Sequence, residues 1–69
     1  MASVQVVNTF KAQRLMSLLS GHIEAITPKS ITARYMNLSI MLDDIMKVRW
    51  RGYLVEYNED IRSLTVMYN

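Results

Sequence analysis

Cysteine is absent from this chain of 69 residues, which limits how so short a chain can stabilise a fold. A domain of this size buries only about 60% of the surface that its unfolded chain exposes, so small domains commonly rely on disulfides, metals or oligomerisation. Without cysteine, disulfides and thiolate zinc sites are excluded. Hydrophobic residues make up 51% of the chain, more than one small core can cover. We therefore expect a single domain over residues 1–69 that forms a homodimer.

The basic residues are spread along the chain, and the formal net charge is only +2. Residues 1–38 hold four basic residues against one acidic residue, whereas residues 39–69 hold four against five. Nucleic-acid binding usually shows as a concentrated basic face, so this distribution permits such binding without indicating it. No run approaches the ~20 apolar residues of a membrane span, and the N-terminus lacks the order of a secretion signal. These observations predict a cytoplasmic protein that does not enter a membrane.

Two helices are predicted in the first half of the chain. The first follows a cap at Asn8 or Thr9, and its apolar residues recur at helical spacing as far as Ile23. Thr27 and the proline after it suit the N-cap and the first position of a helix. These residues predict a short second helix over Pro28–Met36.

A third helix and a hairpin are predicted in the second half. The helix runs from a cap at Ser39 to a stop at Gly52, because apolar residues recur three or four apart between them. The segments Tyr53–Tyr57 and Ile61–Tyr68 are rich in β-branched and aromatic residues, which predicts the two strands of a hairpin. At the N-terminus, Ser3–Val7 is short and β-branched, which favours a strand or an ordered arm.

The sequence ITARYMNLS at residues 31–39 resembles the bend of a helix-turn-helix. Ala33 stands four residues before the turn residue Asn37, and a small side chain there lets two helices cross closely. Leu38 and Ser39 follow as the hydrophobic residue and the cap of the next helix.

Residues 48–57 extend this resemblance, because VRWRGYLVEY is similar to the end of a recognition helix, a glycine turn and a first wing strand. Over Phe10–Tyr68 the chain therefore resembles the winged helix-turn-helix family. The resemblance implies an α+β fold with three helices followed by a C-terminal hairpin wing. In that family the third helix enters the major groove of DNA, and the wing touches the neighbouring backbone or minor groove.

The function implied by the resemblance is that of a small transcriptional regulator, which binds double-stranded DNA as a homodimer and acts by occupying its site. Phage and other mobile-element regulators often have this format. The residues expected to face base edges are Asn37, Ser39, Ile40, Asp43 and Lys47. Those expected to hold phosphates are Lys29, Arg34, Arg51 and Arg62.

Acidic residues leave a second hypothesis open. Asp43 and Asp44 in the third helix either stabilise its dipole or repel phosphate, and Asp43 can pair with Lys47 one turn on. The hairpin loop carries Glu59 and Asp60, which would also meet phosphates unfavourably. The alternative is a protein-interaction module that binds a partner protein and has little affinity for DNA.

No catalytic or metal-binding constellation is present in the sequence. The lone histidine, His22, has only Glu24 beside it and nothing to complete a coordination set. The chain has no cysteine nucleophile, no glycine-rich phosphate loop and no second histidine. We therefore expect no enzymatic activity, no metal and no cofactor.

Overall fold

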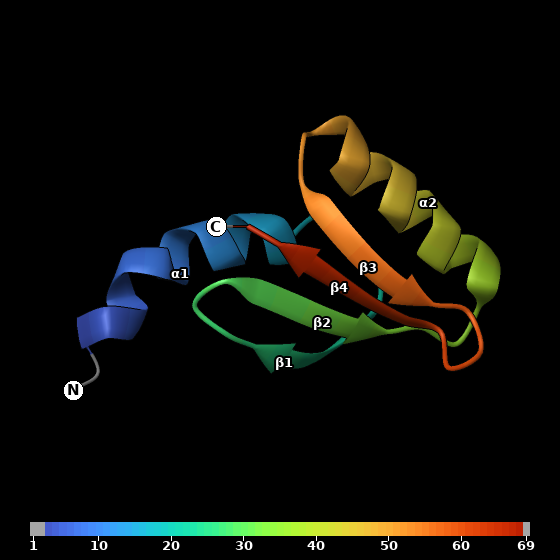
Figure 1. Ribbon diagram of the computed structural model, residues 1–69, viewed down its shortest axis with the longest axis horizontal. Helices are drawn as coiled ribbons and strands as arrows, with labels where there is room; N and C mark the ends of the chain where they lie inside the picture. The colour runs from blue at the N-terminus through green and yellow to red at the C-terminus, as the bar shows by residue number, and fades with distance from the viewer. Residues whose placement is uncertain (1–2, 69) are drawn as a thin grey trace.

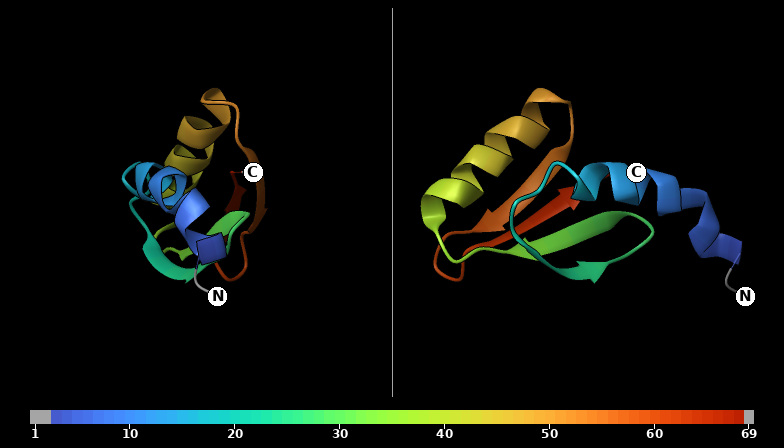
Figure 2. Two further views of the ribbon diagram at one scale, coloured as in Figure 1. Left: turned by 90° about the vertical axis from the view of Figure 1, so that its left-hand side faces the viewer. Right: turned by 180° about the vertical axis from the view of Figure 1, so that it is seen from behind.

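The computed structural model describes residues 3–68 as two helices and four strands. In chain order the elements are α1 (Ser3–Met16), β1 (His22–Ile26), β2 (Ser30–Arg34), α2 (Leu38–Trp50), β3 (Leu54–Asn58) and β4 (Ser63–Met67). The strands form one antiparallel sheet in the order β1-β2-β4-β3. Both helices lie against the same face of this sheet, which makes a two-layer structure (Figures 1 and 2). Within the described residues, neither helix has the length and apolar character needed to cross a membrane.

The α+β class agrees with the expectation, but the winged helix-turn-helix is wrong. In place of the second helix predicted over Pro28–Met36, the chain forms the hairpin β1–β2. The hydroxyl of Thr27 accepts hydrogen bonds from the backbone N–H groups of Lys29 (3.1 Å) and Ser30 (2.9 Å). The prediction from Thr27 and Pro28 was wrong because a side-chain acceptor followed by the fixed φ of proline suits the start of a β-turn as well as the start of a helix.

Strand β2 is built on an alternation within the supposed helix-turn-helix bend. Ile31, Ala33 and Tyr35 are buried, whereas the residues between them lie on the other face of the sheet. This period of two is typical of a strand. Pairing with β4 places Ile31 opposite Val66 and Ala33 opposite Leu64. A partner about 30 residues away in the chain therefore decides the conformation of this segment.

The N-terminal segment also differs from the expectation. Residues Ser3–Val7, expected to form a strand or arm, are the first turns of α1. That helix ends at Met16 rather than near Ile23, and tighter hydrogen bonds such as Leu18 N–H to the Leu15 carbonyl (2.9 Å) follow it. Ile23 instead lies in β1, opposite Ala33.

Helix α2 lies close to its predicted position. Its N-cap is Asn37 rather than Ser39, because the Asn37 side-chain oxygen accepts from the N–H of Ser39 at 2.7 Å. Gly52, at φ 93°, follows the helix end as predicted. The predicted hairpin is present as β3 and β4, but it forms half of the sheet and is no wing.

The core fills the space between the helices and the sheet. Side chains without any exposed surface come from α1, both central strands and α2, and they comprise Leu15, Ile31, Ala33, Met41, Val48, Leu64 and Val66. The opposite face of the sheet carries polar side chains at its centre. There Thr32 and Thr65 share a hydrogen bond at 3.0 Å between their hydroxyls, and Arg34 pairs with Glu24 at 3.5 Å.

Candidate functional site

The residues expected to read base edges lie on or next to α2, which is not the recognition helix of a winged helix-turn-helix. The Asn37 side chain is occupied by the cap of α2, and Ser39 donates to it. Ile40 and Asp43 are exposed. Lys47 donates to the Leu18 carbonyl at 2.9 Å, which directs its ammonium toward the connection between α1 and β1. Asn37 therefore caps α2, and Lys47 braces it against the connection after α1.

The four residues expected to hold phosphates divide between the two ends of the sheet. Lys29 lies in the β1–β2 turn, and Arg51 follows the last residue of α2. At the other end, Arg34 pairs with Glu24, and the Arg62 Nε donates to the Tyr35 carbonyl at 3.0 Å. Arg51 lies beside two further basic side chains, those of Lys11 and Arg14.

A groove at the first of these ends is lined by cations from segments far apart in the sequence. Lys11 and Arg14 come from α1, and Arg51 comes from the end of α2. The groove has a volume of about 550 Å³, and its remaining lining residues are Gly52, Tyr53, Leu54, Met67 and Tyr68. No aspartate or glutamate is among them. Lys29 is close by, because its carbonyl accepts from the Tyr68 N–H at 2.9 Å.

Local structure explains why these cations share one surface. Lys11 and Arg14 are three residues apart on a helix, so they lie on the same face. Burial of Ala12 and Leu15 holds that part of α1 on the core. The guanidinium of Arg14 also lies 5.7 Å from the ring centre of the exposed Phe10. Sequence reasoning missed this pair as a binding feature, although their spacing was visible.

The two ends of the sheet differ in charge, although Arg34 and Arg62 lie at the same end as the acidic residues. We call Lys11, Arg14, Lys29 and Arg51 the basic end. Glu59 and Asp60 form an acidic turn between β3 and β4, at the opposite end of the sheet (Figure 1). Backbone hydrogen bonding from Tyr35 to the Arg62 carbonyl at 2.9 Å holds this turn beside the start of α2. Basic residues that are spread along the sequence thus gather at one end of the sheet.

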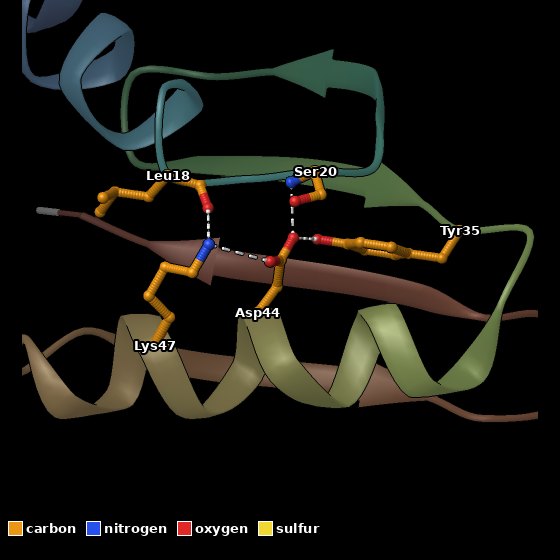
Figure 3. A network of polar contacts seen from close by, with 5 residues as sticks. All are labelled: Leu18, Ser20, Tyr35, Asp44 and Lys47. Atoms are coloured by element: carbon orange, nitrogen blue, oxygen red, sulfur yellow. Dashed lines mark hydrogen bonds and ion pairs between the residues drawn. The ribbon is translucent and has the colours of Figure 1, made fainter.

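A second polar feature is a buried network around Asp44 (Figure 3). Asp44 is only 1% exposed, and its Oδ2 accepts from the Tyr35 hydroxyl and from the Ser20 N–H at 2.6 Å. Its Oδ1 lies 3.4 Å from the Lys47 ammonium, which also binds the Leu18 carbonyl. These contacts fasten α2 to the end of β2 and to the connection after α1.

The role expected for the two aspartates is thereby corrected. Lys47 pairs with Asp44, not with Asp43, and Asp44 takes a core position instead of facing solvent. The signal was present in the sequence, because Asp44 shares helical spacing with the buried Met41, Ile45 and Val48. A carboxylate within an apolar stripe needs hydrogen-bond donors. All buried side-chain nitrogen and oxygen atoms of the described residues have a partner.

Burial raises the pKa of Tyr35 well above its usual value near 10, and the hydrogen bond and negative charge of Asp44 raise it further. The unfolded chain therefore loses this proton at a lower pH than the folded chain. The stabilisation is complete below about pH 10 and is lost as the pH rises above it. We expect the free energy of unfolding, measured with urea, to fall less steeply above pH 10 in Tyr35→Phe than in the wild type. Equal slopes would contradict this role of the phenol.

The fold and these two features describe a two-layer α+β protein with a braced helix and an open basic groove. No protein-family model matches the chain, and neither do the curated proteins or the solved structures with which it was compared. Function is therefore inferred from the chemistry of its surface.

Proposed function

We propose that the protein binds double-stranded DNA through phosphate contacts at its basic end. The observation that carries this proposal is a groove lined by Lys11, Arg14 and Arg51, with Lys29 in the neighbouring β1–β2 turn; its described lining residues include no aspartate or glutamate. Cations from separate segments repel one another, and a phosphate backbone relieves that repulsion while releasing counterions. Contacts of this kind position a protein on DNA without reading its sequence.

Binding by the basic end differs from reading by a recognition helix. The start of α2, which was expected to enter the major groove, lies beside the acidic turn and carries the exposed Asp43. Phosphates would be repelled there and attracted at the opposite end of the sheet. The protein would act by occupying DNA, with little preference between sequences.

Salt dependence provides the test of this proposal. Four phosphate contacts predict a slope of about −3.6 in log affinity against log salt, so a rise from 50 to 200 mM should weaken binding about 150-fold. Fluorescence anisotropy of a labelled random duplex measures this directly. Absence of binding at 50 mM salt would refute the proposal.

Matched variants locate the contacts. Lys11→Ala with Arg14→Ala should reduce the magnitude of the slope by about two, because each phosphate contact contributes about one. Arg34→Ala removes a charge that is paired with Glu24 on the far face of the sheet, so it should leave the slope unchanged. Equal effects of Arg14→Ala and Arg34→Ala would indicate a response to net charge alone and would contradict the proposed site.

A protein-interaction module remains the second candidate function. It is favoured by the exposed apolar side chains of α2, including Met46 at 71% exposed and Trp50 at 91%. Contiguous exposed apolar surface commonly marks a protein-binding site. This function and DNA binding use different surfaces and are compatible with each other.

A further inference from the structure

One flank of α2 carries a row of apolar side chains that no other part of residues 3–68 fully covers. Leu38, Leu42, Met46 and Trp50 recur every four residues, so they follow one side of the helix. Their exposed fractions rise from 38% and 39% to 71% and 91% along the helix. We call these four residues the α2 row. A tryptophan so exposed is a typical anchor of a protein interface.

The α2 row faces the free edge of the sheet. Asp44 and Lys47 lie on the opposite flank of α2, where they contact the connection after α1. Helix α2 packs on β3 and β4, and β3 is the last strand of the sheet. Tyr57 and Ile61, each 49% exposed, are further exposed apolar side chains on the β3–β4 hairpin.

Opposite charges lie at the two ends of the α2 row. Arg49 is three residues after Met46 and therefore lies beside it near the C-terminal end of the helix. At the N-terminal end, the turn that holds Glu59, Asp60 and Arg62 lies beside the start of α2, fixed by the hydrogen bonds between Tyr35 and Arg62, and its net charge is negative. Arg49 is not among the lining residues of the basic groove, so its charge is available to this surface.

We propose that this surface binds a second copy of the chain, with the two α2 helices antiparallel across a two-fold axis. An isologous two-fold contact perpendicular to the helices makes them antiparallel. The basic end of each row then meets the acidic turn of the other copy, whereas a parallel arrangement would join like charges. Leu38 faces Trp50 of the second copy, and Leu42 faces Met46. The two ends of the row are thus complementary in charge across the two-fold axis.

This inference goes beyond the proposed function and does not depend on it, because it is tested without DNA. Sedimentation equilibrium should give twice the chain mass of 8.0 kDa at micromolar concentration. Trp50 is the single tryptophan, so its emission should shift to longer wavelength as dilution separates the copies. A wild-type protein that stays monomeric at millimolar concentration would overturn the proposal and point to a different partner protein.

Met46→Glu should raise the dissociation constant of the dimer at least 30-fold, the effect expected of an interface hot spot. The matched control is Met36→Glu, because Met36 is 96% exposed and lies beside Ile40 and His22, away from the α2 row. Circular dichroism shows whether each variant is folded. Equal effects of the two substitutions would overturn the proposal.

Charge exchange tests the orientation of the helices. Arg49→Glu alone and Glu59→Lys with Asp60→Lys should each weaken the dimer, and the combination of all three should restore it. If the combined variant dimerises no more tightly than the separate variants, the antiparallel contact is overturned, however much each separate change weakens the dimer.

Cross-linking gives a second test of orientation, because the native chain has no cysteine. In the antiparallel dimer, two copies of Leu38→Cys lie about 18 Å apart along the helices, too far for a disulfide. A mixture of Leu42→Cys and Met46→Cys chains should form a mixed disulfide. Efficient cross-linking of Leu38→Cys by itself would overturn the antiparallel arrangement.

Discussion

Replacing Asp44 by alanine should lower the free energy of unfolding by about 3 kcal/mol. The substitution leaves the Tyr35 hydroxyl and the Ser20 N–H without their acceptor, and it removes the ion pair with Lys47. Each buried donor that loses its partner costs about 1–3 kcal/mol. A domain of 69 residues has a total stability of only about 3–10 kcal/mol, so this loss would unfold much of the protein if its stability lies near the lower end of that range.

Asp43→Ala is the matched control, since it removes the same side chain from the neighbouring, exposed position of the helix. It should change the free energy of unfolding by less than about 0.5 kcal/mol. Urea unfolding followed by circular dichroism at 222 nm measures both variants. Similar losses for the two substitutions would show that charge near the helix start, rather than the buried network, supports the fold.

Replacing Gly21 by alanine should cost about 2–3 kcal/mol, the second largest effect expected. A methyl group at Gly21 would lie 2.6–2.9 Å from three ring atoms of Tyr35. That ring is buried and its hydroxyl is held by Asp44, so it cannot move aside without breaking the network. Where no clash exists, a change from glycine to alanine commonly stabilises by 0.4–1 kcal/mol. The sign of the measured change is therefore informative.

A double-mutant cycle separates this clash from other effects. In a Tyr35→Leu background the smaller side chain leaves room, and the cost of Gly21→Ala should largely disappear. Gly52→Ala provides the contrast. No atom lies within 4 Å of a methyl group there, but the φ of 93° is strained for alanine whatever residue 35 is. Additive losses for Gly21→Ala and Tyr35→Leu would contradict the proposed contact.

Prediction from sequence succeeded for elements whose structure depends on residues close together in the chain. Helix α2 was placed to within about two residues because its apolar spacing and the glycine after it act over a few residues of chain. The hairpin of β3 and β4 was found for the same reason, since its strands are joined by a short turn.

The candidate site was less accessible to sequence reasoning. Arg51 and Lys29 were proposed to hold phosphates, and the structure places both near the basic groove. Lys11 and Arg14 were missed because they lie far from Arg51 in the sequence. They come close to it only when α1 packs on the core. Arg34 was expected on a second helix and Arg62 near the tip of a wing, and neither element forms. Arg34 pairs instead with Glu24, and the Arg62 side chain donates to the Tyr35 carbonyl.

Residues 27–35 show where local information ends. Thr27 and Pro28 begin a helix or a turn equally well, because both conformations use a side-chain acceptor and the φ of proline. Composition, charge balance, α2 and the final hairpin follow from the sequence, since they depend on residue types or on neighbours a few positions away. The choice of strand for β2, the burial of Asp44 and the gathering of the basic end depend on contacts between distant segments. Those contacts form only in the folded chain. Local preferences do not decide between helix and strand there, and pairing with β4 and burial against α2 supply the free energy that favours the observed conformation.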